Sequence, residues 1–137
     1  MVKNINRDIN ILSKKSEDMT KDDLQVAYDL IDTLKFNRHR CVGMAANMIG
    51  VLKNCIVFID SKENINIMIN PKIIKKDGEY KTEEGCLSLD GIRPTTRFKK
   101  IKVEYLDLDF KLKIKTYTDY TAQIIQHEID HLFGIII

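Results

Sequence analysis

The stretch Asp119–Gly134, DYTAQIIQHEIDHLFG, decides how the rest of this chain must be arranged. Its apolar residues recur at the spacing of an amphipathic helix, and Gly134 stands where a glycine commonly ends one. We therefore predict a helix from about Asp119 to Phe133. An apolar helix face needs a partner, and the strand-like segments that precede it are the available cover.

The same stretch contains His127-Glu128-Ile129-Asp130-His131, an HExxH motif. Histidines four residues apart project from one helix face, so both imidazoles can bind one metal ion while Glu128 lies beside a water on that metal. The chain has only three histidines, and two of them fall at this spacing. The alternative is a helix whose histidines only pack or face solvent.

A catalytic metal of this kind needs a third protein ligand, and Glu84-Gly85-Cys86-Leu87-Ser88 is the best source. Gly85 would let the backbone approach a metal, and Cys86 offers a thiolate. A buried structural thiol is the alternative. Cys41 and Cys55 are competing ligands, although Cys55 begins an apolar strand and fits a core position.

Upstream of this segment, short apolar and alternating runs between Asn54 and Glu104 predict strands, with one hairpin turning at Asp77-Gly78. A second hairpin joins IKVEY to FKLKI across Asp107–Asp109. An amphipathic helix is predicted over Thr20–Phe36, with Thr20 as N-cap. The expected fold class is α+β: antiparallel β-strands packed around the C-terminal HExxH helix, with an N-terminal amphipathic helix, in a single domain over residues 1–137.

Composition narrows the classes of partner. Lysine and arginine number 22 against 20 acidic residues, so the net charge is +2 and no basic run points to direct binding of nucleic acid. No apolar run approaches the roughly 20 residues of a membrane helix, so no membrane association is expected. Three cysteines and the absence of a secretory pattern favour the reducing cytoplasm.

The stretch Cys41–Gly50, CVGMAANMIG, is rich in small residues, which indicates a backbone that something approaches closely. A tight packing contact explains this as well as a substrate does. With EGCLS (84–88) and QHEIDHLFG (126–134), however, it resembles the peptide deformylases, whose three segments read GxGxAAxQxG, EGCLS and QHExDHLxG in this order. The second and third match at every specified position.

The resemblance implies a metallo-amidohydrolase that removes the formyl group from N-formylmethionyl peptides. One divalent ion, Fe2+ or a substitute such as Zn2+, Ni2+ or Co2+, would be held by Cys86, His127 and His131. Glu128 would move the proton of the attacking water, and the backbone N–H of Leu87 would stabilise the oxyanion. The ribosome exit region is a further partner that the substrate suggests.

The resemblance also assigns substrate-binding positions. Val42, Gly43 and Met44 would border the peptide as it pairs like an added strand, and Ile124, Glu84 and His127 would line the methionine pocket. Met48 stands in the same segment, beside the peptide. We also expect two supporting contacts: Glu84 orients a ligand imidazole, and Arg97 pairs with Asp130.

Two positions depart from the family pattern. Met48 replaces the glutamine whose amide donates to the oxyanion, and a thioether cannot donate. Losing one such donor costs about 10²–10³ in rate, unless the neighbouring Asn47 or a water takes over. Cys41 replaces the first glycine. These departures motivate an alternative, a catalytically impaired paralogue that binds metal and peptide. A small zinc protease is a weaker alternative, because such proteases generally take their third metal ligand from downstream of the motif and only six residues follow His131.

Overall fold

The computed structural model describes residues 1–137 as one five-stranded antiparallel sheet and three α-helices. The strand order is β1-β2-β3-β4-β5, with every neighbouring pair antiparallel. The α-helices are α1 (Ile9–Leu12), α2 (Leu24–Phe36) and α3 (Asp119–Leu132). The strands are β1 (Gly43–Ala45), β2 (Cys55–Ile59), β3 (Ile65–Cys86), β4 (Leu89–Leu106) and β5 (Leu112–Thr118). Single 3₁₀ turns, η1 (Lys21–Asp23) and η2 (Ala46–Ile49), precede α2 and follow β1.

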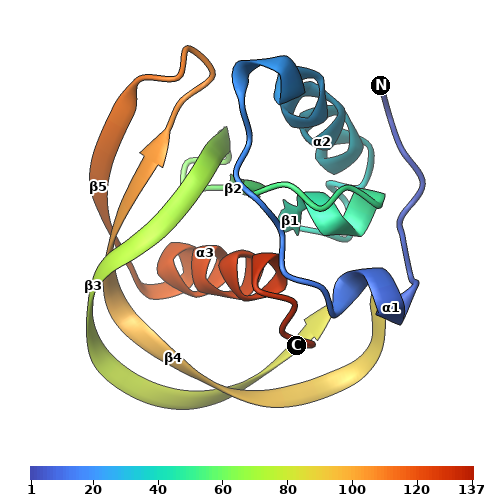
Figure 1. Cartoon of the computed structure of the whole chain (residues 1–137). Coiled ribbons are helices and arrows are strands. Elements are labelled where there is room, and N and C mark those ends of the chain that lie inside the picture. Colours follow the sequence, from blue (N-terminus) through green and yellow to red (C-terminus); the bar gives the residue numbers. More distant parts are fainter.

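The long strands β3 and β4 curve around α3, and α2 lies apart from this curve, beside β1 and β2 (Figure 1). Strand β2 separates two apolar clusters because successive side chains point to opposite faces. Ile56 and Phe58 pack with α3, whereas Cys55 and Val57 pack with α2. This arrangement explains why CIVFI is apolar at every position. It also makes Cys55 a core thiol, whose pKa is raised by burial to about 12.

The predicted turn at Asp77-Gly78 is wrong, because β3 continues through it. Asp77 pairs with Lys100 and Glu79 with Phe98, so the register passes Gly78 without a break. Gly78 does have the left-handed backbone that favours glycine, with φ of 77°, but as a local distortion inside the strand. The hairpin instead turns where Cys86 pairs with Leu89, within the EGCLS segment.

The second predicted hairpin is confirmed. Leu106 pairs with Leu112, and the side chain of Asp107 accepts hydrogen bonds from the backbone N–H groups of Asp109 and Lys111. Phe110 falls within this turn with φ of 59°, so β5 begins two residues later than the apolar pattern suggests.

The ends of the two long helices follow the sequence signals. The backbone N–H of Thr20 donates to Asp23 at 2.9 Å as a capping-box contact, although the first turn is η1 and α2 begins at Leu24. At the end of α3, the backbone N–H groups of Gly134 and Ile135 donate to His131 and Asp130 respectively. This is a Schellman pattern, and Gly134 supplies its positive φ of 77°. No helix is long and apolar enough to cross a membrane.

Candidate metal centre

Three ligand atoms from two distant segments meet where the end of β3 passes α3. The Cys86 Sγ and one ring nitrogen each of His127 and His131 all lie within 4.8 Å of one another. The two Nε2 atoms are 3.0 Å apart, as expected for histidines one helical turn apart on one face. Neither Cys41 nor Cys55 belongs to this group. Of the three cysteines, only Cys86 therefore lies with the two histidines.

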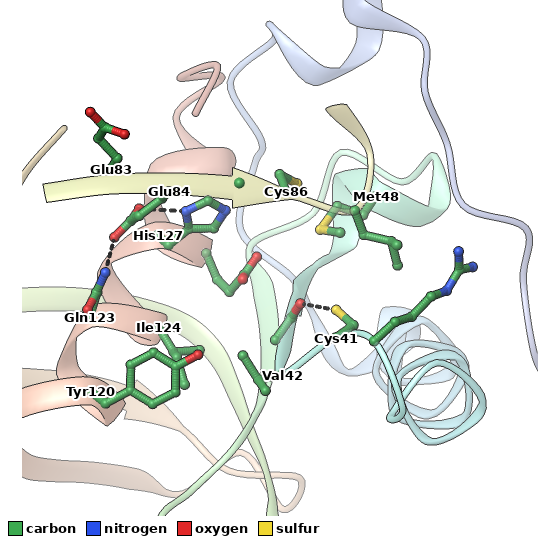
Figure 2. A pocket seen from close by; sticks show the side chains of 15 residues that line it. Cys41, Val42, Met48, Glu83, Glu84, Cys86, Tyr120, Gln123, Ile124 and His127 are labelled. Atoms are coloured by element: carbon green, nitrogen blue, oxygen red, sulfur yellow. Dashed lines mark hydrogen bonds and ion pairs between the residues drawn. The ribbon is translucent and has the colours of Figure 1, made fainter. Parts of the chain in front are cut away.

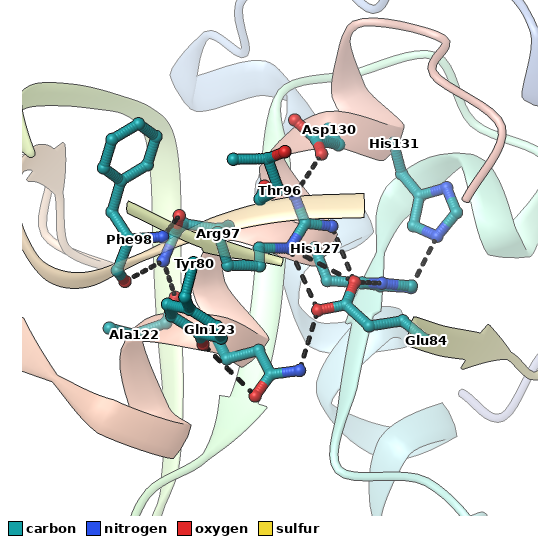
Figure 3. Close-up of polar contacts among 11 residues, drawn as sticks. Tyr80, Glu84, Thr96, Arg97, Phe98, Ala122, Gln123, His127, Asp130 and His131 are labelled. Carbon is teal, nitrogen blue, oxygen red and sulfur yellow. Dashed lines mark hydrogen bonds and ion pairs between the residues drawn. The ribbon is translucent and has the colours of Figure 1, made fainter. Parts of the chain in front are cut away.

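A buried carboxylate fixes the orientation of the His127 ring. The Nδ1 of His127 lies 2.7 Å from the Oε1 of Glu84, which leaves Nε2 directed at the ligand group (Figure 3). Glu84 also accepts from Arg97 Nη2 at 2.6 Å and from Gln123 Nε2 at 2.9 Å. Burial alone would raise the pKa of Glu84, but these hydrogen bonds outweigh it and lower the pKa to about 2. Glu84 is therefore a permanent anion behind the ligand histidine.

The expected ion pair between Arg97 and Asp130 is present. Arg97 Nη1 donates to Asp130 Oδ2 at 2.6 Å, and the same guanidinium contacts Glu84 with its other nitrogens. The arginine side chain is only 4% exposed, so one buried cation joins β3, β4 and α3. Arg97 thereby holds the carboxylate that holds His127.

The histidine pair carries a positive charge at the position where a metal cation would bind. Burial lowers the pKa of His127, but Glu128, Cys86 and Glu84 outweigh it and raise the pKa to about 10. Burial, together with the charge on His127, lowers the pKa of His131 to about 3. The pair therefore carries one proton more than two neutral imidazoles, which is a single positive charge at the point where the two Nε2 atoms face each other. Thiolate and imidazole ligands at that point suit iron, zinc, nickel or cobalt.

Glu128 lies beside the ligand group and has the features of a proton carrier. Its side chain is buried, and its Oε1 has no hydrogen-bond partner in the protein. Burial raises its pKa to about 7, against the lowering effect of His127. Strand β1 passes so close that a Cβ added at Gly43 would lie 2.9 Å from Glu128 Oε2 and 2.8 Å from Ile124 Cγ2. Glycine is thus required at position 43, because any side chain there would clash with Glu128 and Ile124.

A cavity of about 310 Å³ opens in front of these groups, between β1, the end of β3 and α3 (Figure 2). Most of the residues predicted from the sequence line it: Val42, Gly43, Met48, Glu84, Cys86, Leu87, Ile124, His127 and Glu128. His131 is fully buried and lies behind this lining. The cavity is also lined by residues that sequence reasoning did not select: Arg40, Glu83, Tyr120 and Gln123.

The side chain of Met44 does not line the cavity, so its expected place beside the peptide remains a prediction about its backbone. Its side chain is fully buried and packs in the cluster beside α2. Side chains alternate along a strand, so Met44 points away from the face that carries Val42 and Gly43. Only its backbone, on the free edge of β1, remains next to the cavity.

Asn47 also differs from the expectation that it could replace the missing glutamine. It is fully buried, and its Nδ2 donates to the backbone carbonyl of His131 at 2.9 Å. Its amide is therefore engaged in holding η2 against α3 and is not part of the cavity lining. Met48, by contrast, does line the cavity, although it is only 1% exposed.

Cys41 occupies the rim of the cavity as a neutral thiol. Its Sγ donates to the backbone carbonyl of Gly43 at 2.9 Å. Burial, with the nearby carboxylate of Glu128, raises its pKa to about 12. The extra side chain at this position is thus folded back on β1 as a hydrogen-bond donor.

Comparisons with known proteins agree on one family. The family model described as polypeptide deformylase matches residues 2–137. The peptide deformylase of Clostridium beijerinckii is 54% identical over 138 residues, covering all of both chains. A class I type b peptide deformylase from Acinetobacter baumannii, in its K1U-bound crystal structure, superposes with a TM-score of 0.89 at 28% identity, covering 99% of this chain and 96% of that one. The Met-Ala-Ser-bound structure of the same protein gives 0.88 at 26% identity, covering 99% and 97%.

Proposed function

The chain belongs to the peptide deformylase family, and from that premise we propose how its own residues carry out the reaction. It is an enzyme that removes the N-formyl group from nascent peptides. The observation that carries the residue assignment is the meeting of Cys86, His127 and His131 at the base of a cavity, with the unpartnered carboxyl oxygen of Glu128 beside them.

We assign Cys86, His127 and His131 as the metal ligands. Fe2+ is the proposed native ion, and Zn2+, Ni2+ and Co2+ are proposed substitutes. When bound, such an ion supplies Lewis-acid chemistry, polarising the formyl carbonyl and acidifying water. The mixed sulfur and nitrogen ligands support a transition metal over calcium or magnesium, which prefer oxygen. Glu84 and Arg97 keep the His127 ring in the orientation that the ligand role needs.

Glu128 is the proposed acid–base residue. Its Oε1 takes the proton of the attacking water and delivers it to the nitrogen that leaves when the formyl C–N bond breaks. A pKa near 7 suits both steps near neutral pH, because the group can accept a proton and release it again.

The backbone N–H of Leu87 is the proposed oxyanion donor. It lies in the hairpin turn next to Cys86, lines the cavity and has no hydrogen-bond partner within the chain. The carbonyl of the same residue, in the next peptide unit, accepts from Arg7 Nη1 at 3.2 Å, which ties the hairpin turn to the N-terminal segment. A free donor on a restrained backbone can stabilise negative charge on the formyl oxygen.

The peptide itself would bind along β1. This strand is at the edge of the sheet and pairs only with β2, so its other edge is open to an added strand. Val42 and Gly43 present that edge to the cavity, and Ile124 with Tyr120 offers apolar surface for the methionine side chain. A relative that was crystallised with Met-Ala-Ser bound supports this mode of use.

The proposed location in the cell follows from the substrate. Formylated chains arise at ribosomes, so we propose that the enzyme acts in the cytoplasm near the ribosome exit region. Co-sedimentation of the protein with ribosomes at low and high salt would test this location.

Formate release tests the catalytic assignment. Protein loaded anaerobically with Fe2+ should release formate from formyl-Met-Ala-Ser, and Glu128→Gln should lower kcat by at least about 10³ while leaving metal content unchanged. Glu83→Gln is the matched control, since Glu83 is an exposed carboxylate on the same cavity with no ion-pair partner. Equal loss in both variants, or full activity in Glu128→Gln, would contradict the role of Glu128.

A further inference from the structure

Arg40 stands at the rim of the cavity without a carboxylate partner. It directly precedes the Cys41–Gly43 segment, its side chain is exposed, and it lines the same cavity as Glu128. Its Nε and Nη2 atoms both donate to the Oδ1 of Asn37, at 3.1 and 2.8 Å. No acidic side chain forms an ion pair with it. The positive charge of Arg40 is therefore not neutralised within the chain.

The acceptor that holds this guanidinium is itself fixed. Asn37 caps the end of α2, is only 2% exposed and donates from Nδ2 to the backbone carbonyl of Thr33 at 2.8 Å. That bond sets which end of the amide faces Arg40. A neutral, buried acceptor positions the guanidinium while leaving its charge and its remaining N–H groups available. Such pre-organisation reduces the entropy lost when an arginine binds a partner.

The shape of the cavity indicates which way a bound peptide must run. The reacting end belongs beside Gly43, where an added Cβ would lie 2.9 Å from Glu128 Oε2. Ala45 and Ala46 are fully buried and do not line the cavity, whereas residues 40–43 all line it. The rest of the peptide therefore leaves along Val42 and Cys41 toward Arg40. An extended peptide advances about 3.3 Å per residue, so its third residue lies about 10 Å from the formyl group, in the direction of the cavity rim at Arg40.

We propose that Arg40 determines substrate preference downstream of the formylmethionine, favouring peptides with a carboxylate side chain at the third residue. This proposal rests on the deformylase activity and adds a preference to it. Guanidinium and carboxylate groups match in charge and geometry, and a lysine at the same substrate position would be repelled. The opposing rim charge, Glu83, lies across the cavity from the Cys41 side in Figure 2, so it does not neutralise this approach.

The test compares formyl-Met-Ala-Xaa-Ala peptides with Xaa as Glu, Gln or Lys. Every peptide carries a C-terminal amide, because a free terminal carboxylate near this position would imitate the side chain. With Fe2+-loaded enzyme at low salt, kcat/KM for the Glu peptide should exceed that for the Lys peptide by about 5-fold, the upper range for an exposed ion pair. The ratio should fall toward 1 in 0.5 M salt, because screening weakens exposed pairs.

Variants assign the preference to one residue. Arg40→Gln should bring the Glu-to-Lys ratio close to 1, Arg40→Glu should invert it, and Arg40→Lys should restore part of it. Arg38→Gln is the matched control, since Arg38 lies two residues away, donates to the backbone carbonyl of Glu63 and does not line the cavity. It should keep the parent ratio.

Two results would overturn the proposal: equal kcat/KM for the Glu and Lys peptides in the parent, or an unchanged ratio in Arg40→Gln. Failure of the proposed function is distinguishable, since it would appear as no formate from any of the three peptides. In that case, the dissociation constants of the unformylated peptides Met-Ala-Xaa-Ala-amide decide the question without turnover. A preference for Glu that Arg40→Gln removes would support the role of Arg40, and equal affinities would refute it.

Discussion

Replacing Glu84 by glutamine should destabilise the protein by about 3 kcal/mol. The lowering of its pKa from 4.5 to about 2 means that the folded protein favours the charged form by about 3 kcal/mol. Burial opposes the charged form of Glu84, but hydrogen bonds from His127 and then from Arg97 outweigh it. Glutamine removes the negative partner of both groups, and the buried Arg97 then retains only Asp130. Breaking a buried pair commonly costs 3–5 kcal/mol, and the surviving contact to Asp130 places this case at the lower end.

The same substitution should weaken metal binding. A glutamine can still accept one hydrogen bond from His127, but it lacks the charge that stabilises the imidazole when it binds a cation. Outer contacts of this kind are worth about 10–100-fold in metal affinity. Two measurements follow for Glu84→Gln: urea unfolding of the metal-free protein near pH 7, and competition for Zn2+ or Co2+ against a chelator of known affinity.

Glu83→Gln is the control for both measurements, because it removes an exposed neighbouring carboxylate that forms no ion pair. It should change the free energy of unfolding by less than about 0.5 kcal/mol and leave metal affinity unchanged. If Glu84→Gln were as stable as the parent and bound metal as tightly, Glu84 would neither stabilise the fold through Arg97 nor support metal binding through His127.

Three further substitutions test separate parts of the structure. Gly43→Ala should lower kcat/KM for formate release by about 10²-fold, because the added Cβ would displace the carboxylate of Glu128. A parent-like rate would contradict the close approach of β1 to Glu128. Gly134→Ala should lower the free energy of unfolding by at least about 1 kcal/mol, since φ is 77° and the Cβ would lie 2.4 Å from the Ser13 carbonyl oxygen. A parent-like midpoint of urea unfolding would count against this packing. Met48→Gln should raise kcat by up to about 10²-fold, because an amide at this cavity position can donate to the oxyanion, and an unchanged kcat would show that the backbone donor suffices.

The sequence predicted the local elements well where one periodic pattern coincided with an end signal. The second hairpin illustrates this, because alternating residues on both sides and the aspartates at its turn gave the same answer as the register of β4 and β5. The Asp77-Gly78 turn failed for a physical reason. Its glycine does have a positive φ, but β3 pairs with β4 on both sides of it, from Ile69 to Cys86, and this long-range pairing overrides a two-residue turn preference.

The residues of the candidate site were likewise predictable from the sequence only in part. His127 and His131 could be placed together from their spacing, because both sit on one predicted helix. Arg40 and Tyr120 could not, because an exposed arginine in a loop and an exposed tyrosine at a helix start carry no pattern of their own. They line the cavity only because the curvature of the sheet brings β1, the end of β3 and α3 to one place. The burial of the Met44 side chain was also not predictable, since three residues of β1 are too few to reveal which face is buried.

The backbone around Met48 explains how the chain can accommodate an unusual residue there. The Met48 carbonyl accepts from the backbone N–H of Asn6 at 2.7 Å, and the Asn47 amide holds the same turn to the His131 carbonyl. These contacts fix the backbone of η2 without using the side chain at position 48, which packs in the buried cluster beside α2. The proposed donor at Leu87 is likewise a backbone group, and the turn that contains it is tied to Arg7 through the Leu87 carbonyl in the next peptide unit. In the mechanism we propose, oxyanion stabilisation depends first on the hairpin turn at Cys86, and a side-chain donor at position 48 would add to it.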